Sequence, residues 1–490
     1  MRKWIAGAGV IAIAFVGALV GNAAMHTSQQ IQVDPVTVDV DAKAAAERLS
    51  RAVQIETVST QGAEFEGFPF LELHDLLEHS YPLVHKTLKR EIVADYSLLY
   101  TWRGSDESLA PMLLMAHQDV VPVEAGTEDA WTHPPFSGAI EDGTIWGRGT
   151  MDDKNNVLAQ LEAVEMMIAD GFQPKRTIYL AYGHDEEIGG TGAVATAALL
   201  KERGVRLYLV LDEGGAIVSN SMPGLDAAPA YVGISEKGYV TVELVARSEG
   251  GHSSMPPPHT ASGRIGAAVA RLEANPMPAA FAGPAGDMLD ALGREMGFGM
   301  KFVFANRWLL GPVVKAQMLG KPASAAMLRT TTAVTMLEGS VKENVLPQVA
   351  RARVNFRILP GDTIDSVVAH VRETIDDDEI EVIANGDIGS NPSPISRIDG
   401  PEFAALERSI REIFPSTPVA PFLVLGATDA RHYAGLSDCV YRFTPNLLEN
   451  QDLKRIHGTD EAVGVENYAK GIGFYVRFVQ NTAGAEIQSP

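Results

Sequence analysis

The sequence predicts an α/β fold in which helices cover the faces of a sheet. Two observations lead to this class: short runs rich in apolar residues alternate with amphipathic helical stretches, and turn residues separate them. The runs predicted as buried strands are 97–104, 111–117, 176–187 and 206–215. Between the second and third of them, residues 155–171 have the pattern of an amphipathic helix that ends at a glycine. Strand, helix and strand in this order imply a sheet with helices on its faces.

Length and composition limit the class of protein further. The chain has 490 residues, enough for two or three domains, and its content of 46% hydrophobic and 21% charged residues is ordinary for a globular protein. Its formal net charge is −22. Because most of such an exterior would repel phosphate groups, we expect no nucleic-acid partner and no anionic membrane surface as a general partner.

The amino terminus differs from the rest of the chain. Arg2 and Lys3 precede an uncharged apolar run over 4–20, and small residues follow at 21–25. This pattern is typical of an export signal, and an uncleaved amino-terminal membrane anchor is the alternative. Both predict a periplasmic, secreted or membrane-anchored protein. Cys439 is the single cysteine, so the chain forms no intramolecular disulfide.

Acidic residues and a histidine follow four successive segments of the predicted sheet. Since ligands collect at the carboxyl ends of strands in such sheets, these side chains are expected to meet at one edge. Imidazole and carboxylate groups together suit a divalent metal ion with one position left for water. The side chains are His117, Asp119, Asp152, Glu186, Glu187, Asp212 and Glu213.

The adjacent pair Glu186 and Glu187 has two interpretations. Neighbouring carboxylates disfavour each other's ionisation, so a solvated loop explains a lone pair of this kind. A metal ion gives the alternative, because one glutamate ligates the ion while the other stays free as a base beside a water molecule.

Six motifs, taken in order, resemble the dinuclear zinc aminoacylase and carboxypeptidase superfamily, and within it the branch of carboxypeptidase S and the N-fatty-acyl-amino-acid synthase/hydrolase. The resemblance begins near residue 40 and covers nearly all of the chain that follows. The motifs are HQDVVPV at 117–123, GRGTMDDK at 147–154, DEEIGG at 185–190, DEGG at 212–215, GGHSS at 250–254 and RIHGTDE at 455–461.

The resemblance implies a mixed-sheet zinc-exopeptidase catalytic domain with an inserted, smaller α/β lid that dimerises. Within the expected lid, 239–248 and 350–359 have the pattern of strands, and 260–274 and 363–375 that of helices. The apolar stretch 280–330 has two interpretations. One is ordinary helical packing within the lid, and the other is a groove for an acyl chain or contact with a membrane. The expected segments are a signal or anchor at 1–26, a linker at 27–41, the catalytic domain at 42–237 and 389–490, and the lid at 238–388.

The resemblance also implies a metal centre of two zinc ions, with cobalt or manganese as alternatives. Asp152 would bridge the ions, and Glu213 is the alternative to Asp212 because relatives can be aligned either way. The implied ligands are His117, Asp152, Glu187, Asp212 and His457.

Further roles follow from the same resemblance. Glu186 would be the general base, and Asp119 would hold the second nitrogen of the ligating histidine. His252 would reach the oxyanion from the lid of a partner subunit, which makes a homodimer part of the expected mechanism. Arg357 and Asn344 match positions near the substrate, and an arginine fork suits a carboxylate.

The function expected from these features is hydrolysis of the amide bond of N-acyl amino acids, including long-chain and reversible versions of the reaction. Carboxypeptidase or dipeptidase action on short peptides is the alternative. A serine hydrolase is disfavoured because G-x-S-x-G is absent, and a gluzincin because H-E-x-x-H is absent. A non-catalytic binding protein with this fold would be expected to have an incomplete set of metal ligands.

Overall fold

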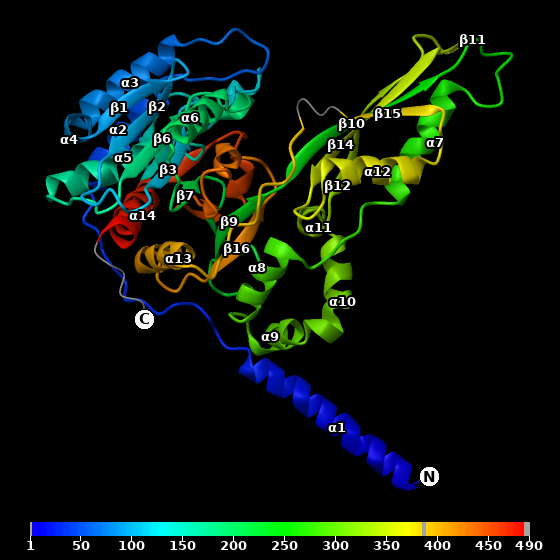
Figure 1. Ribbon diagram of the computed structural model, residues 1–490, viewed down its shortest axis with the longest axis horizontal. Coiled ribbons are helices and arrows are strands. Elements are labelled where there is room, and N and C mark those ends of the chain that lie inside the picture. Colours follow the sequence, from blue (N-terminus) through cyan, green and yellow to red (C-terminus); the bar gives the residue numbers. More distant parts are fainter. Residues whose placement is uncertain (1, 385–388, 485–490) are drawn as a thin grey trace.

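The computed structural model describes residues 2–384 and 389–484, and it is built around a ten-stranded mixed sheet (Figure 1). Strands β3 (Met112–His117), β6 (Ile178–Gly183) and β7 (Val210–Asp212) lie side by side and run parallel, which confirms the predicted α/β class. The strand order is β1 (Lys89–Val93), β2 (Ser97–Trp102), β6 (Ile178–Gly183), β3 (Met112–His117), β7 (Val210–Asp212), β17 (Val440–Arg442), β9 (Ala230–Glu236), β8 (Ile217–Ser219) and β18 (Leu447–Glu449), with β16 (Val419–Val424) on β9.

Helices cover both faces of this sheet, and the alternation of apolar residues along the strands explains why. In β3, Leu114 belongs to the core on one face, whereas Leu113 and Met115 belong to the core on the other. The face of Leu114 is covered by α2 (Ala42–Val53), α5 (Lys154–Ala169), α13 (Pro401–Ile413) and α14 (Val465–Ala483). The opposite face is covered by α6 (Thr191–Glu202).

Helix α5 follows the predicted pattern closely. It ends at Ala169, and Gly171 then adopts a φ of +76°, a conformation that glycine adopts without strain. Two short helices, α3 (Phe68–Ser80) and α4 (Pro82–Thr87), precede the first strand of the sheet. A small sheet of β4 (Ile140–Glu141), β5 (Thr144–Trp146) and β19 (Ala462–Gly464) brings a late segment of the chain beside residues 144–146.

A second sheet stands apart from the first, to the right in Figure 1. It is antiparallel, and α7 (Ala261–Ala274) and α12 (Ile364–Ile375) cover one of its faces and form a separate core with it. Its order is β12 (Thr331–Glu338), β14 (Val349–Ile358), β10 (Gly238–Arg247) and β15 (Ile380–Ala384). All of these elements lie within the predicted insert 238–388, whose boundaries stay a prediction. Residues 385–388 of that range lie outside the described residues.

Four helices fill the stretch 283–328. The first of them, α8 (Gly283–Gly293), packs against β16 of the main sheet, where Met288, Leu289 and Leu292 meet Tyr231 and Ala420. This part of the predicted lid therefore shares a core with the main sheet. The helices are α8 (Gly283–Gly293), α9 (Phe298–Ala305), α10 (Arg307–Leu319) and α11 (Pro322–Leu328).

The first helix, α1 (Arg2–Met25), extends away from the rest of the molecule and meets it at α9 (Figure 1). Within the part of the chain whose side chains are described, no helix combines the length and apolar character needed to cross a bilayer.

Candidate metal centre and active site

The parallel strands β3, β6 and β7 bring their carboxyl ends to one edge of the main sheet. His117 is the last residue of β3, Asp212 is the last residue of β7, and Glu186 follows the end of β6 by three residues. Residues separated by dozens of positions in the sequence thus meet at one edge, as expected for ligand sites in α/β sheets.

Asp152 lies between two imidazoles. Its Oδ1 is 2.9 Å from Nε2 of His117, and its Oδ2 is 3.0 Å from Nε2 of His457. Burial acts to raise the pKa of Asp152, but hydrogen bonds from both histidines outweigh it and hold the pKa below its ordinary value. The hydrogen bonds to Asp152 and Glu187 raise the pKa of His457 to about 10. A carboxylate with one oxygen toward each imidazole is suited to bridge two cations.

Glu187 joins two clusters of candidate metal ligands. One cluster contains His117, Glu186 and Glu187, and the other contains Asp152, Glu187 and His457. Within each cluster the potential ligand atoms lie within 4.8 Å of one another. Burial raises the pKa of Glu186 well above its ordinary value, against the charge of His117. Two sets of donors that share one carboxylate fit two divalent cations at close range.

The buried carboxylate of Asp119 organises this cluster. Oδ1 of Asp119 lies 3.3 Å from Nδ1 of His117, and its backbone oxygen lies 3.0 Å from the same nitrogen. The two carboxylate oxygens also accept the backbone N–H groups of Glu186 at 3.1 Å and Glu187 at 3.2 Å. One side chain therefore fixes both the imidazole and the pair of glutamates, and the sequence had predicted only the first of these contacts.

The turn after β6 explains the sequence DEEIGGTG. Asp185 accepts the N–H groups of Thr191 at 2.8 Å and Gly192 at 2.9 Å, so it stabilises the start of α6. Gly190 has a φ of +70°, and a Cβ there would lie 2.0 Å from Oδ1 of Asp429. The two glutamates are thus held in a single short turn, η2 (Glu186–Ile188), between a capping aspartate and a required glycine.

Glu461 is a structural residue of the site to which the sequence analysis gave no role. Its Oε1 accepts the N–H groups of Gly149, Met151 and Asp152 at 2.8–3.1 Å. Its Oε2 accepts a hydrogen bond of 2.7 Å from Nη1 of Arg148, and both side chains are buried. Glu461 therefore fixes the loop that presents Asp152. The only signal in the sequence was its position, four residues after His457 in one motif.

The neighbouring residues Asp212 and Glu213 differ from each other in their surroundings. Both oxygens of Asp212 accept backbone N–H groups, from Glu213 at 2.9 Å and from Ala430 at 2.7 Å. Burial raises the pKa of Glu213 well above its ordinary value, and the charge of Asp152 is the next cause. Neither residue belongs to the two clusters described above. Because both oxygens of Asp212 already accept backbone N–H groups, Glu213 stays a candidate ligand beside Asp212, the residue predicted from the sequence.

Paired substitutions separate these two candidates. We expect Glu213→Gln to remove metal from the purified protein, and Asp212→Asn to lower the unfolding temperature with metal retained, because the new amide would direct an N–H at a backbone N–H. Elemental analysis and thermal unfolding of both variants check this expectation. Loss of metal from Asp212→Asn alone would restore Asp212 as the ligand.

Three predicted site residues lie on the second sheet or at its tip, outside the clusters. His252 is exposed in β11 (Gly251–His252), where its Nδ1 lies 2.9 Å from the hydroxyl of Ser254. The backbone oxygen of Asn344 accepts the N–H of Ser253 at 3.1 Å, so Asn344 is close to His252. Arg357 lies on β14 with its guanidinium 4.9 Å from the ring centre of Tyr239. Among the described residues, no hydrogen bond or ion pair joins these three residues to Asp152, whose partners are His117, His457 and Glu461.

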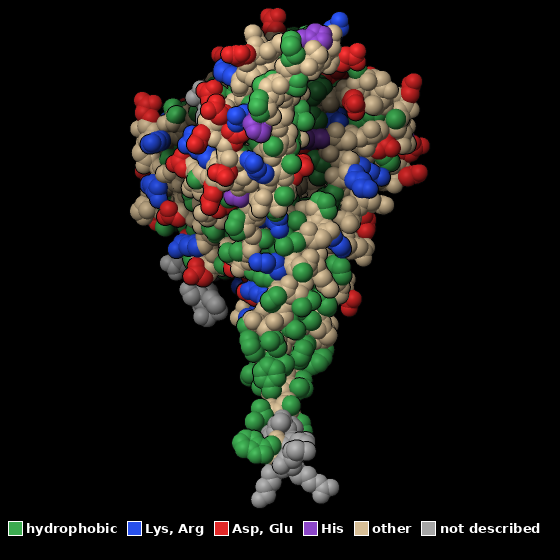
Figure 2. Space-filling view, turned by 90° about the vertical axis from the view of Figure 1, so that its right-hand side faces the viewer, with side chains coloured by type: hydrophobic (Ala, Val, Ile, Leu, Met, Phe, Trp, Pro, Cys, Tyr) green, Lys and Arg blue, Asp and Glu red, His purple; other side chains and the backbone are tan. Residues whose placement is uncertain are grey.

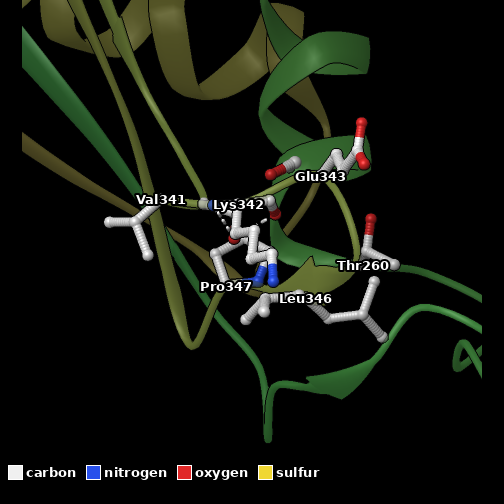
Figure 3. A pocket seen from close by; sticks show the side chains of 9 residues that line it. Thr260, Val341, Lys342, Glu343, Leu346 and Pro347 are labelled. Atoms are coloured by element: carbon white, nitrogen blue, oxygen red, sulfur yellow. Dashed lines mark hydrogen bonds between the residues drawn. The ribbon is translucent and has the colours of Figure 1, made fainter.

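The strand β13 (Val345–Leu346) pairs with β11, and an open pocket of about 420 Å³ lies beside it (Figure 3). Thr260, Lys342, Glu343 and Leu346 are among the residues that line it. This pocket belongs to the tip that carries His252 rather than to the metal clusters.

The fold and the site define a metal-dependent hydrolase of amide or peptide bonds, and comparison with known proteins identifies its family. The chain belongs to peptidase family M20/M25/M40, which it matches over residues 113–481. This confirms the resemblance predicted from the six motifs.

Relatives agree with this assignment, and a solved structure is similar in fold. The chain is 41% identical to "Probable carboxypeptidase S-like 2" of Dictyostelium discoideum, with 95% of this chain and 91% of the relative covered. It is 40% identical to the mouse "N-fatty-acyl-amino acid synthase/hydrolase PM20D1", with 89% and 88% covered. In fold it is similar to the metallo-carboxypeptidase Sso-CP2 of Sulfolobus solfataricus, with a TM-score of 0.64, 18% identity, and 89% of this chain and 98% of that chain covered.

Proposed function

We propose that the protein hydrolyses the amide bond of N-acyl amino acids, with Glu186 as the general base. The observation that carries this proposal is the arrangement of Glu186 and Glu187 on Asp119, beside the carboxylate of Asp152. The same arrangement supports the reverse condensation, because a base that accepts a proton in one direction donates it in the other.

The donor set fits two divalent cations, and we propose zinc. His117, Asp152, Glu187 and His457 would hold them, together with Glu213 or Asp212. When bound, such ions supply the positive charge that lowers the pKa of water and stabilises an oxyanion. The distances agree with this assignment, since Nε2 of His457 lies 3.0 Å from Oδ2 of Asp152 and 3.2 Å from Oε1 of Glu187, close enough for the three groups to share one cation.

The protein's own residues then perform the proton transfers. Glu186 would accept the proton of the attacking water and pass it to the amide nitrogen that leaves. Its burial raises its pKa and so makes its carboxylate a stronger base than an exposed glutamate. Asp119 acts on this step through its hydrogen bond to the N–H of Glu186, and is a positioning residue.

The remaining roles also stay proposals. Arg357 would pair with the carboxylate of the amino-acid part, Asn344 would lie near it, and the oxyanion would be met by His252 of a second copy in a homodimer. Export from the cytoplasm, through residues 1–26 as a signal or an anchor, is proposed from the sequence pattern alone.

A substrate panel tests the acyl preference against carboxypeptidase action, which the carboxypeptidase S-like relatives support to a comparable degree. We expect purified protein supplied with zinc to hydrolyse N-oleoyl-phenylalanine with a higher kcat/KM than benzyloxycarbonyl dipeptides. Glu186→Gln is the control for contaminating activity. Turnover of the dipeptides that is faster by two orders of magnitude would exclude the acyl-amino-acid proposal and establish the alternative.

A further inference from the structure

The end of the molecule formed by α1, α9 and α10 exposes many large apolar side chains. Figure 2 shows hydrophobic side chains gathered over its tapering end. Trp308 and Val313 of α10 are 68% and 58% exposed, and Phe298 of α9 is also exposed. On α1, the exposed apolar residues are Trp4, Val10, Ile11, Ile13, Phe15, Val16, Val20 and Met25. Exposed apolar surface of this extent marks a contact site. We call the exposed apolar residues of these three helices the apolar end.

Helix α1 is joined to this surface by specific contacts. The side-chain amide of Asn22 donates to the backbone oxygen of Ala305 at 2.6 Å, and that of Asn306 donates to the backbone oxygen of Leu19 at 3.1 Å. The ring of Phe15 lies edge-on to that of Trp308, with centroids 6.4 Å apart. The apolar residues of α1 therefore continue those of α9 and α10 as one surface.

The charge of this region differs from that of the whole protein. Residues 296–337 contain no Asp or Glu, although the chain has 62 acidic residues among 490 and about five would be expected in a stretch of this length. The same stretch contains five basic residues, of which Arg307 pairs with Asp290 at 2.9 Å. The chain, whose net charge is −22, thus contains one region that is basic and apolar.

We propose that the apolar end is a docking surface for a lipid bilayer that contains anionic headgroups. The apolar side chains of α1, α9 and α10 enter the boundary between headgroups and acyl chains, and the basic residues next to them face the phosphates. This combination favours a lipid surface over a second copy of the chain, because two copies would bring the same basic residues together without an anionic partner. The inference does not depend on the substrate of the enzyme.

An environment-sensitive dye tests the position of α10. Val313→Cys and the control Ile92→Cys are labelled with a nitrobenzoxadiazole maleimide in the full chain. The native Cys439 is buried, so it is expected to stay unlabelled. Ile92 on β1 is a matched control because it is 52% exposed. With vesicles of phosphatidylcholine and phosphatidylglycerol, we expect the emission from position 313 to rise and shift to shorter wavelength, and that from position 92 to stay unchanged.

Affinity measurements complete the test. The double variant Trp308→Glu, Val313→Glu is expected to bind these vesicles at least tenfold more weakly in flotation, and Ile92→Glu less than twofold. Added salt should weaken binding of the unchanged protein. The proposal is overturned if the protein does not float with the vesicles, or if it floats while the dye at 313 stays in water. It is also overturned if the dye responds to protein concentration without lipid, because that would indicate a second copy.

Discussion

Replacement of Glu186 by glutamine is expected to lower kcat by roughly 10³-fold or more without loss of metal, since a positioned general base contributes typically 10²–10⁴-fold. The amide of glutamine fills the same volume but accepts no proton from water. Asp119 would still hold the backbone N–H at position 186, so the turn and its neighbour Glu187 should keep their places. Steady-state kinetics and elemental analysis of the same preparation measure both quantities.

Glu187→Gln is the matched comparison, because the two residues are adjacent and share the support of Asp119. Glu187 belongs to both clusters of candidate ligands, so its loss is expected to deplete metal as well as activity. Equal metal depletion in the two variants would contradict the division of roles. Unchanged kinetics in Glu186→Gln would remove Glu186 as the base.

The second large effect is expected from Glu461. Its carboxylate is buried, pairs with Arg148 and accepts three backbone N–H groups. Removal of one partner from a buried pair costs about 3–5 kcal/mol, because the remaining charge is left without compensation. Glu461→Gln is therefore expected to lower the free energy of unfolding by an amount in this range, and to weaken metal binding because the loop before Asp152 loses its anchor.

Glu91→Gln provides the control for this prediction. Glu91 pairs with Arg203 at 2.8 Å near the surface, where both side chains are partly exposed. Such pairs contribute about 0–1 kcal/mol, so this variant should unfold close to the unchanged protein. Denaturant unfolding of the two variants, followed by circular dichroism, gives the comparison. A Glu461 variant as stable as the Glu91 variant would show that Arg148 finds another partner.

The strands of the main sheet were predictable because each is a short apolar run with turn residues on both sides. The prediction overran at the ends: 176–187 was expected as one strand, but β6 stops at Gly183 and Glu186 lies in a short 3₁₀ turn. Asp185 causes the difference, because it directs its carboxylate to the N–H groups of Thr191 and Gly192. A side chain that caps the following helix ends the strand before it.

The site was predictable in part for the same reason. Motifs in the sequence predicted four of the side chains that meet here. They come together because parallel strands or loops end near one another. The four are His117, Asp152, Glu187 and His457. Asp119 was expected beside His117, but its bonds to the backbone of residues 186 and 187 depend on how two strand ends face each other. Glu461 was missed because its partners are backbone groups 309–312 positions away.

The stretch 283–328 shows another limit of the sequence. Its composition allowed packing within the lid, and α8 instead joins the core of β16. An apolar helical pattern shows that a face is buried or docked, but does not identify the surface that it meets. The same pattern occurs in α9 and α10, which lie near α1, and there the apolar side chains are exposed and form the apolar end.

The central proposal is that the imidazoles and carboxylates at the edge of the main sheet hold two divalent cations. Metal content of the purified protein, measured by mass spectrometry together with hydrolysis of an N-acyl amino acid, tests it most directly. We expect two ions per chain, loss of hydrolysis when a chelator removes them, and recovery when zinc is returned. Folded protein that hydrolyses the amide at the same rate without bound metal would contradict the account.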